Sequence, residues 1–218
     1  MEYIDARVKQ HGTIAFVVVL GVVLAIASMA FFWKLGASSI THVDEATHAM
    51  VTRSLRESGD WLNLDFLSHP YFRKPPLTFW LRAVAQDFWG ESEFTVRLVS
   101  ALAGIATTML VAVWAWLWTR RLHVMLLAGT LYPLLPSSFS HMFREGETDG
   151  LLVFLLTLAA FLLWRSLRSP RLVIAAGAVL GLAAMTKSVA FVIIPLAFAA
   201  AIWLGGRWPY TAKQVLFA

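Results

Sequence analysis

Residues 14–33 form a run of 20 residues without a single charged side chain. About 20 apolar residues in a helix cross the roughly 30 Å hydrocarbon core of a bilayer, so this run predicts a membrane-spanning helix. The basic residues Arg7 and Lys9 precede it. A cleaved signal peptide would end at Ala30, but the apolar run continues through Trp33, which favours an uncleaved membrane anchor.

Later apolar runs predict five more spans, at residues 96–118, 122–139, 151–164, 172–186 and 189–204. The last two belong to one long apolar stretch that Lys187 interrupts. Because a lysine at the bilayer centre costs about 2.5–3.5 kcal/mol, we place Lys187 at the apex of a helical hairpin. With 59% hydrophobic and 14% charged residues, the chain is too apolar for a soluble domain. The sequence therefore predicts an all-α integral membrane protein with about six transmembrane helices.

Basic residues mark every second connection between the predicted spans. Arg120 and Arg121 follow the second span, and Arg165, Arg168 and Arg171 follow the fourth. The positive-inside rule then places the N-terminus in the cytoplasm. The opposite, outer face receives the large loop 34–95, the turn 137–150 and the Lys187 apex. These three segments contain nearly all of the acidic residues, so we expect the chemistry on that face.

Composition excludes two classes of function. The formal net charge is +5, but the basic residues lie between apolar runs and form no continuous stripe, which argues against a nucleic-acid partner. The chain has no cysteine, so disulfides and thiolate metal sites are excluded. Within the loop 34–95, the pattern predicts an amphipathic helix at 43–57, a turn at 58–60 and a second helix that opens at Pro75-Pro76.

Asp44 lies 11 residues beyond the first predicted span, near the membrane surface. An acid at this position is explained equally well by the start of a helix, where the backbone dipole favours a negative charge. The functional alternative is a carboxylate that accepts the proton of an attacking hydroxyl. Asp149, which opens the fourth span, has the same two explanations.

Cations on the outer face also have two interpretations. Arg73 and Lys74 stand before a rigid double proline, where they either anchor the helix to lipid phosphates or present Lys74 to one particular phosphate. Lys187 is the more informative cation, because a tight apolar hairpin needs no charge at its apex, and intramembrane ionisable groups are functional candidates. Arg53 and Arg144 are further candidates for phosphate binding.

The histidines of the outer loop, His42, His48 and His69, accompany the acids. Asp44 and His48 have the spacing to face one metal ion on a helix, but no third ligand follows at a definite spacing, so we interpret the histidines as solvated. A carboxylate beside a cluster of cations suits transfer from a membrane-held phosphate ester to a hydroxyl, since cations stabilise the phosphate that leaves.

Several short motifs, in order along the chain, resemble one enzyme family. They are Asp44-Glu45-Ala46, Ser58-Gly59-Asp60-Trp61, Lys74-Pro75-Pro76-Leu77, Glu93-Phe94, Arg97-Leu98, Thr148-Asp149 and Thr186-Lys187. The series is similar to the ArnT-like and protein-mannosyltransferase-like glycosyltransferases, polytopic GT-C enzymes that use polyprenyl- or dolichyl-phosphate sugars. The chain would be the N-terminal part of a GT-C transmembrane catalytic domain.

The resemblance implies an inverting sugar transferase on the periplasmic face of the bacterial inner membrane. Asp44 would be the principal catalytic carboxylate and Asp149 the second acid, while Lys74 and Lys187 would contact the phosphate of a polyprenyl-phosphate sugar donor. Glu45 would complete the paired acids, with a divalent metal ion left open. The acceptor would be a hydroxyl or phosphate group of lipid A, of another glycan or of a protein. Arg97 is expected to hold the outer loop to the second span.

The sequence also departs from the family pattern. Val99 stands where a proline is usual, and Gly146-Glu147 is unusually acidic for its turn. Family members are normally much longer, so we expect a fragment or a truncated product. A transporter or channel, and a non-catalytic membrane scaffold, are the competing interpretations. Transport predicts charges deep within several spans and repeated halves, whereas here the charges gather in outer loops and at span ends.

Overall fold

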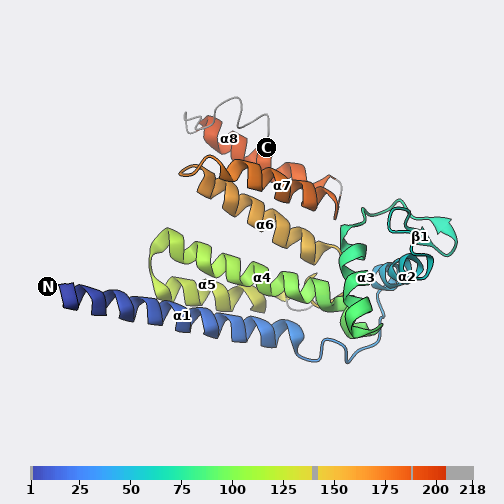
Figure 1. The fold of residues 1–218 in the computed structure, drawn as a ribbon, viewed down its shortest axis with the longest axis horizontal. Helices are drawn as coiled ribbons and strands as arrows, with labels where there is room; N and C mark the ends of the chain where they lie inside the picture. The colour runs from blue at the N-terminus through green and yellow to red at the C-terminus, as the bar shows by residue number, and fades with distance from the viewer. Residues whose placement is uncertain (1, 139–141, 188, 205–218) are drawn as a thin grey trace.

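Apolar helices that run side by side form the body of the molecule (Figure 1). The computed structural model describes residues 2–138, 142–187 and 189–204. The helices of this bundle are α1 (Glu2–Phe32), α4 (Glu93–Thr119), α5 (Leu122–Leu134), α6 (Asp149–Ser166), α7 (Leu172–Ala184) and α8 (Ile193–Leu204). The predicted all-helical membrane fold is confirmed.

By length and composition, three helices in the described part of the chain can cross a membrane, at 12–32, 93–119 and 149–166. The other three predicted spans are apolar helices of 12 or 13 residues. Helix α5 ends at Leu134, earlier than the predicted 139, because Pro136 favours an extended Leu135, which has φ −59° and ψ 135°. Residue 139 itself lies outside the described residues.

Small residues let the bundle helices approach closely. Gly129 of α5 lies so near α1 that an added Cβ would stand 2.5 Å from Val23 Cγ1. Gly104 of α4 likewise lies close to α1, where an added Cβ would stand 3.0 Å from Phe31 Cδ2. Such contacts are typical of membrane helices, where packing rather than water exclusion holds the helices together.

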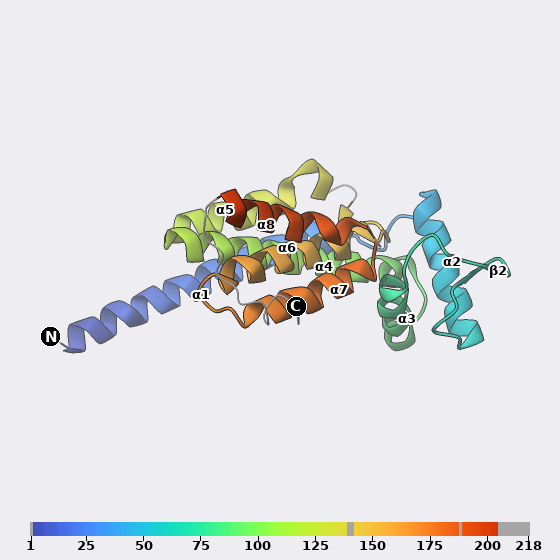
Figure 2. The ribbon, with the colours of Figure 1, turned by 90° about the horizontal axis from the view of Figure 1, so that it is seen from above.

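A second layer, which we call the outer layer, covers one end of the bundle. It contains α2 (Val43–Ser58), the short strands β1 (Asp65–Phe66) and β2 (His69–Pro70), and α3 (Leu77–Trp89). The views agree that α3 lies between the bundle and α2 (Figure 2). The layer has its own core, formed by Val51, Leu55, Leu64, Tyr71, Phe79 and Ala83.

Both helices predicted for the outer loop are confirmed, with small shifts at their ends. Helix α2 ends at Ser58, and Gly59 caps it in the left-handed conformation with φ 70° that glycine adopts without strain. Helix α3 begins directly after Pro75-Pro76, with Pro76 at its N-cap. The amide of Leu77 donates to the carbonyl of Met185 at 3.1 Å, which joins the start of α3 to the end of α7.

The threading of the bundle brings four segments to one end. The end of α1, the start of α4, the start of α6 and the turn between α7 and α8 all lie beside the outer layer, whereas the α4–α5 and α6–α7 connections lie at the opposite end (Figure 1). Lys187 lies in the turn between α7 and α8, as predicted. The fold therefore gathers the candidate residues on the side that carries α2 and α3.

Candidate active site

A buried ion pair anchors α2 to the bundle. Glu45, 1% exposed, accepts from Arg97 Nε at 2.7 Å and from Arg97 Nη2 at 3.1 Å. The same guanidinium donates through Nη1 to the carbonyls of Leu35 and Ser38, both at 2.9 Å. The prediction that Arg97 holds the outer loop to the second span is confirmed.

The backbone of Gly146 joins this pair to two further buried side chains. Its amide donates to Glu45 Oε1 at 2.8 Å. Its carbonyl accepts from Arg82 Nη2 at 2.7 Å and from His48 Nδ1 at 3.2 Å. An added Cβ at Gly146 would lie 2.6 Å from Val96 Cγ1, so the contact requires glycine. The turn before α6 is thus fixed to α2 and α3.

His48 lies inside this network and is 1% exposed, so the expectation of a solvated histidine is wrong at this position. Burial, together with the positive charge of Arg82, lowers its pKa from 6.5 to about 4. With this pKa the ring is neutral at physiological pH. Since Nδ1 donates to the Gly146 carbonyl, the one ring proton is on Nδ1. His42 and His69 are exposed, as expected.

Asp44 lies beside Glu45 in the first turn of α2, but its side chain is exposed. Asp44 and Lys74 both act electrostatically on His48: Lys74 lowers its pKa and Asp44 raises it. Burial raises the pKa of the Tyr71 hydroxyl; the charge of Arg73 opposes this effect, and the charges of Asp44 and Glu147 add to it. Asp44 and Lys74 therefore lie around the same buried histidine.

Asp149 and Lys187 form an ion pair and are the second pair of candidate site residues. Lys187 Nζ lies 2.8 Å from Asp149 Oδ1, and both side chains are about two-fifths exposed. Asp149 is the first residue of α6, three residues after Gly146, whose backbone is hydrogen-bonded to α2 and α3. Lys74 lies three residues before Leu77. The amide of Leu77 donates to the carbonyl of Met185 at the end of α7, two residues before Lys187. The structure thus gathers both predicted acids and both predicted lysines at the same end of the bundle.

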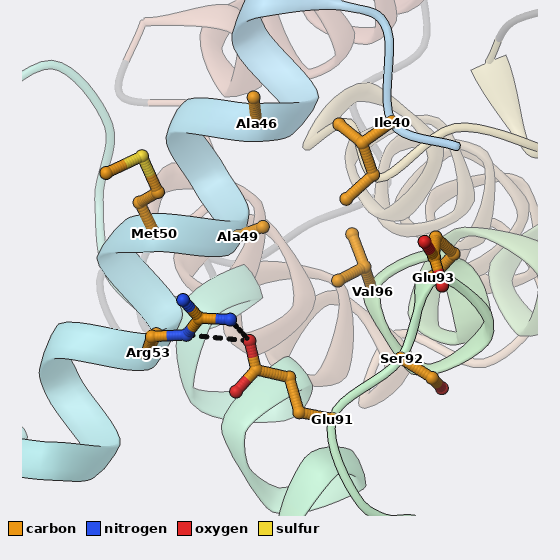
Figure 3. Close-up of a pocket in the computed structure, with 9 residues that line it drawn as sticks. All are labelled: Ile40, Ala46, Ala49, Met50, Arg53, Glu91, Ser92, Glu93 and Val96. Carbon is orange, nitrogen blue, oxygen red and sulfur yellow. Dashed lines mark hydrogen bonds and ion pairs between the residues drawn. The ribbon is translucent and has the colours of Figure 1, made fainter.

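Arg53 and Arg144 lie apart from this group. Arg53 is nine residues after Asp44 on α2, which at 100° per residue puts it on the opposite face of the helix. There it pairs with Glu91 at the edge of a separate pocket (Figure 3). Arg144 donates to the carbonyls of Ala30 and Trp33 at 2.6 and 2.7 Å, and so caps the end of α1. The structure gives both arginines structural partners.

Glu45 has the wrong surroundings for a metal ligand. Its two oxygens accept three hydrogen bonds from Arg97 and Gly146. Among residues 2–138, 142–187 and 189–204, no three His, Asp or Glu side chains stand close enough together to hold an ion. The residues present do not fit a metal centre at Glu45.

Sequence reasoning missed the buried polar group formed by His48, Arg82 and Glu147. Arg82 is fully buried, and its pKa is lowered to about 10 by burial, against the opposing charges of Glu45 and Glu147. Glu147 is 7% exposed, and its Oε2 lies 3.9 Å from His48 Nδ1. The sequence signal for this buried polar group was Glu147, the unusual acid before Thr148, because it supplies a charge opposite to Arg82.

Comparisons with known proteins show which family the chain resembles. The family model for dolichyl-phosphate-mannose-protein mannosyltransferase matches residues 73–218. An undecaprenyl phosphate-alpha-4-amino-4-deoxy-L-arabinose arabinosyl transferase 2 of Pseudomonas fluorescens is 28% identical over 90% of the chain and 36% of its own length. A similarly named transferase of Pseudomonas aeruginosa is 31% identical over 64% of the chain and 26% of its own length.

A solved structure has the same fold. ArnT from Cupriavidus metallidurans bound to undecaprenyl phosphate superimposes with a TM-score of 0.76 and 22% identity, over 90% of the chain and 38% of ArnT. The chain therefore spans little more than a third of the length of this structure and of the Pseudomonas fluorescens relative.

We expect Glu45→Gln to destabilise the protein by about 3–5 kcal/mol, because it leaves the buried Arg97 without a counter-charge. The measurement is the free energy of unfolding from SDS titration in mixed micelles. Glu57→Gln, an exposed change on the same helix, is the control and should stay within about 0.5 kcal/mol of wild type. Equal stability of the two variants would show that the ion pair does not anchor α2.

His48 should make stability depend on pH. Its folded-state pKa is about 4 and its ordinary value is 6.5, so between these values the unfolded chain binds the proton more readily. Stability is therefore lost as the pH falls from 6.5 to 4, by on the order of 3 kcal/mol. His48→Gln, which keeps a donor for Gly146, should flatten this part of the unfolding curve. His69→Gln, a change at an exposed histidine of the same layer, is the matched control and should leave the curve as in wild type.

Proposed function

The chain belongs to the dolichyl-phosphate-mannose-protein mannosyltransferase family, and from this premise we propose that it carries part of the active site of a membrane glycosyltransferase. The donor is a polyprenyl-phosphate sugar, and the acceptor is a hydroxyl of a lipid, glycan or protein. The observation that carries the proposal is the meeting of two acids and two lysines where the outer layer covers the bundle.

The reaction assigns a separate task to each member of the site. An acceptor hydroxyl attacks the anomeric carbon, and Asp44, whose carboxylate is exposed, accepts its proton. The bond from the anomeric carbon to the phosphate oxygen breaks, and the polyprenyl phosphate leaves with the electron pair. Lys74 and Lys187 stabilise the added negative charge, so the leaving group needs no proton. The sugar is transferred with inversion.

Asp149 acts on the donor side through Lys187. The 2.8 Å contact holds the ammonium at the mouth of the site, where a phosphate can share it. A lysine has several rotatable bonds, and the carboxylate limits its positions before the donor binds. Arg53 and Arg144 have no part in this proposal, because other partners engage them.

The Asp44→Asn variant should lose transfer by at least 100-fold, because the amide accepts no proton from the hydroxyl. The measurement is transfer of labelled sugar from a polyprenyl-phosphate donor in membranes that contain the whole protein. Glu57→Gln on the same helix should keep the wild-type rate. Transfer at the wild-type rate by a correctly inserted Asp44→Asn protein would remove Asp44 as the base. Uptake of substrate into sealed vesicles without any covalent product would show that the protein is a transporter and not a transferase.

The proposed location is the bacterial inner membrane, with the N-terminus in the cytoplasm and the outer layer in the periplasm. Support comes from the five arginines near the α4–α5 and α6–α7 connections, which the positive-inside rule assigns to the cytoplasm.

Because the chain has no cysteine, single cysteines report this topology directly. A membrane-impermeant maleimide added to intact spheroplasts should label Glu57→Cys in α2 and leave Arg168→Cys unlabelled. Both positions are exposed, so permeabilised cells should label both and serve as the control. Labelling of Arg168→Cys in intact spheroplasts would reverse the proposed orientation.

A further inference from the structure

Two small cavities border the last turn of α1. One is a polar cavity of about 240 Å³, where the chain leaves α1 for the outer layer. The other is an apolar groove of about 270 Å³ between α1 and α5. Helix α4 packs against α1, α5 and α6, and so stands between this groove and the α7–α8 side of the bundle (Figure 1). Neither cavity is lined by Lys74 or Lys187, so the proposed reaction uses neither of them.

The polar cavity has a positive charge in excess. Three cations line it, Lys34, Arg97 and Arg144, against the two carboxylates of Glu45 and Glu145. Arg97 is already paired with Glu45. The Lys34 side chain is exposed, and no acid in the described part of the chain lies within ion-pair distance of it. An anion from the surroundings would balance this charge.

The backbone at Lys34 does not call for a lysine. Its φ is 52°, in the left-handed region that glycine adopts without strain and that any residue with a Cβ adopts at a cost. The charge of the side chain therefore needs an explanation other than the turn that ends α1. A lysine just beyond a membrane span often serves as a general anchor to lipid head groups. The neighbouring groove favours one particular lipid instead.

The groove offers a surface for an acyl chain. Its lining is almost entirely apolar and consists of Ile26, Met29, Ala30, Trp33 and Leu134. Met29, Trp33 and Leu134 are each more than half exposed, although they are large and apolar. The stretch from Ile26 to Trp33 extends about 10 Å along α1. The groove therefore lies within the predicted span, directly below the level of the polar cavity.

Arg144 joins the two cavities. It lines the polar cavity, and it donates to the carbonyls of Ala30 and Trp33, which both line the groove. Lys34 follows Trp33 directly in the chain. A molecule with an anionic head and an apolar tail fits this pair of cavities, because its two ends match their two chemistries.

The chemistry of the polar cavity distinguishes between lipid head groups. Ser38, Ser39 and Thr41 line it, and their hydroxyls can donate to and accept from hydroxyls of a ligand. A phosphodiester supplies the negative charge that Lys34 lacks. An ammonium on the head group would be repelled by Lys34 and Arg144. A head group with hydroxyls and no ammonium is therefore the best match.

We propose that one phosphatidylglycerol molecule of the surrounding bilayer binds at the end of α1. Its phosphodiester pairs with Lys34, its glycerol hydroxyls bond to the hydroxyls of the polar cavity, and one acyl chain occupies the groove between α1 and α5. This lipid is a structural ligand of the bundle and not a substrate of the proposed reaction.

Native mass spectrometry of the whole, detergent-solubilised and delipidated protein tests the inference by titration with phosphatidylglycerol. Wild type should bind it roughly fivefold more tightly than phosphatidylethanolamine, whose ammonium the cations of the cavity oppose. It should bind glycerophosphoglycerol, the same head group without acyl chains, roughly 100-fold more weakly than the lipid, because the groove then stays unused.

Variants test the two cavities separately. Lys34→Gln should weaken phosphatidylglycerol binding roughly fivefold by removing the cation, and Lys34→Arg should retain it. Met29→Trp should weaken binding by filling the groove. The controls are Arg121→Gln, which removes an exposed cation at the opposite end of the bundle, and Val18→Trp, which adds the same ring at an exposed position of α1 outside the groove. Both controls should bind the lipid as wild type does.

Equal affinity for phosphatidylglycerol and phosphatidylethanolamine, or for the lipid and glycerophosphoglycerol, would overturn the inference. So would wild-type binding by either Lys34→Gln or Met29→Trp. A loss with Arg121→Gln as large as that with Lys34→Gln would show that Lys34 is only a general anchor to the lipid surface. These results do not depend on the transfer assay, because neither Lys34 nor Met29 takes part in the proposed reaction.

Discussion

The geometry of the outer layer depends on the backbone contacts of Gly146. Its N–H donates to Glu45 and its carbonyl accepts from His48 and Arg82, so one residue joins α2, α3 and the turn before α6. These partners lie 64 to 101 residues away in sequence. Asp149 follows three residues later at the start of α6. Because this turn is held in place, Asp149 has a defined position relative to α2, which carries Asp44.

The contacts of this network matter for stability because its charged groups are buried. Arg82, Arg97 and Glu45 are each at most 4% exposed, and a buried charge is costly unless opposite charges and hydrogen bonds surround it. Glu45 and Glu147 supply the negative charge that Arg82 and Arg97 require. The acidic turn that departs from the family pattern at Glu147 thus has a physical reason. The outer layer and the bundle are held together by polar contacts that cannot be lost singly without leaving a charge unpaired.

The spans, the two outer helices and the Lys187 apex could be predicted from sequence, because each depends on local patterns: an apolar run, a proline pair, a charge between apolar halves. The burial of His48 could not, since it results from a contact with a carbonyl 98 residues away. The same applies to Arg53. Its charge suggested phosphate binding, but its partner Glu91 is 38 residues distant and lies on the face of α2 away from Asp44. Local sequence identifies charged residues, and tertiary contacts decide which of them remain available to bind a ligand.

In two places, one of two nearby acids is buried and holds the backbone, while the other is exposed at the candidate site. Glu45 is buried in an ion pair, while Asp44, rotated by about 100° on the same helix, stays exposed. Glu147 is buried beside His48, while Asp149, two residues on, reaches Lys187 at the surface. In each case the buried acid holds the backbone from which the exposed acid projects. In the proposed mechanism, this arrangement gives the exposed acids rigid supports, which an attack that depends on the position of one carboxylate requires.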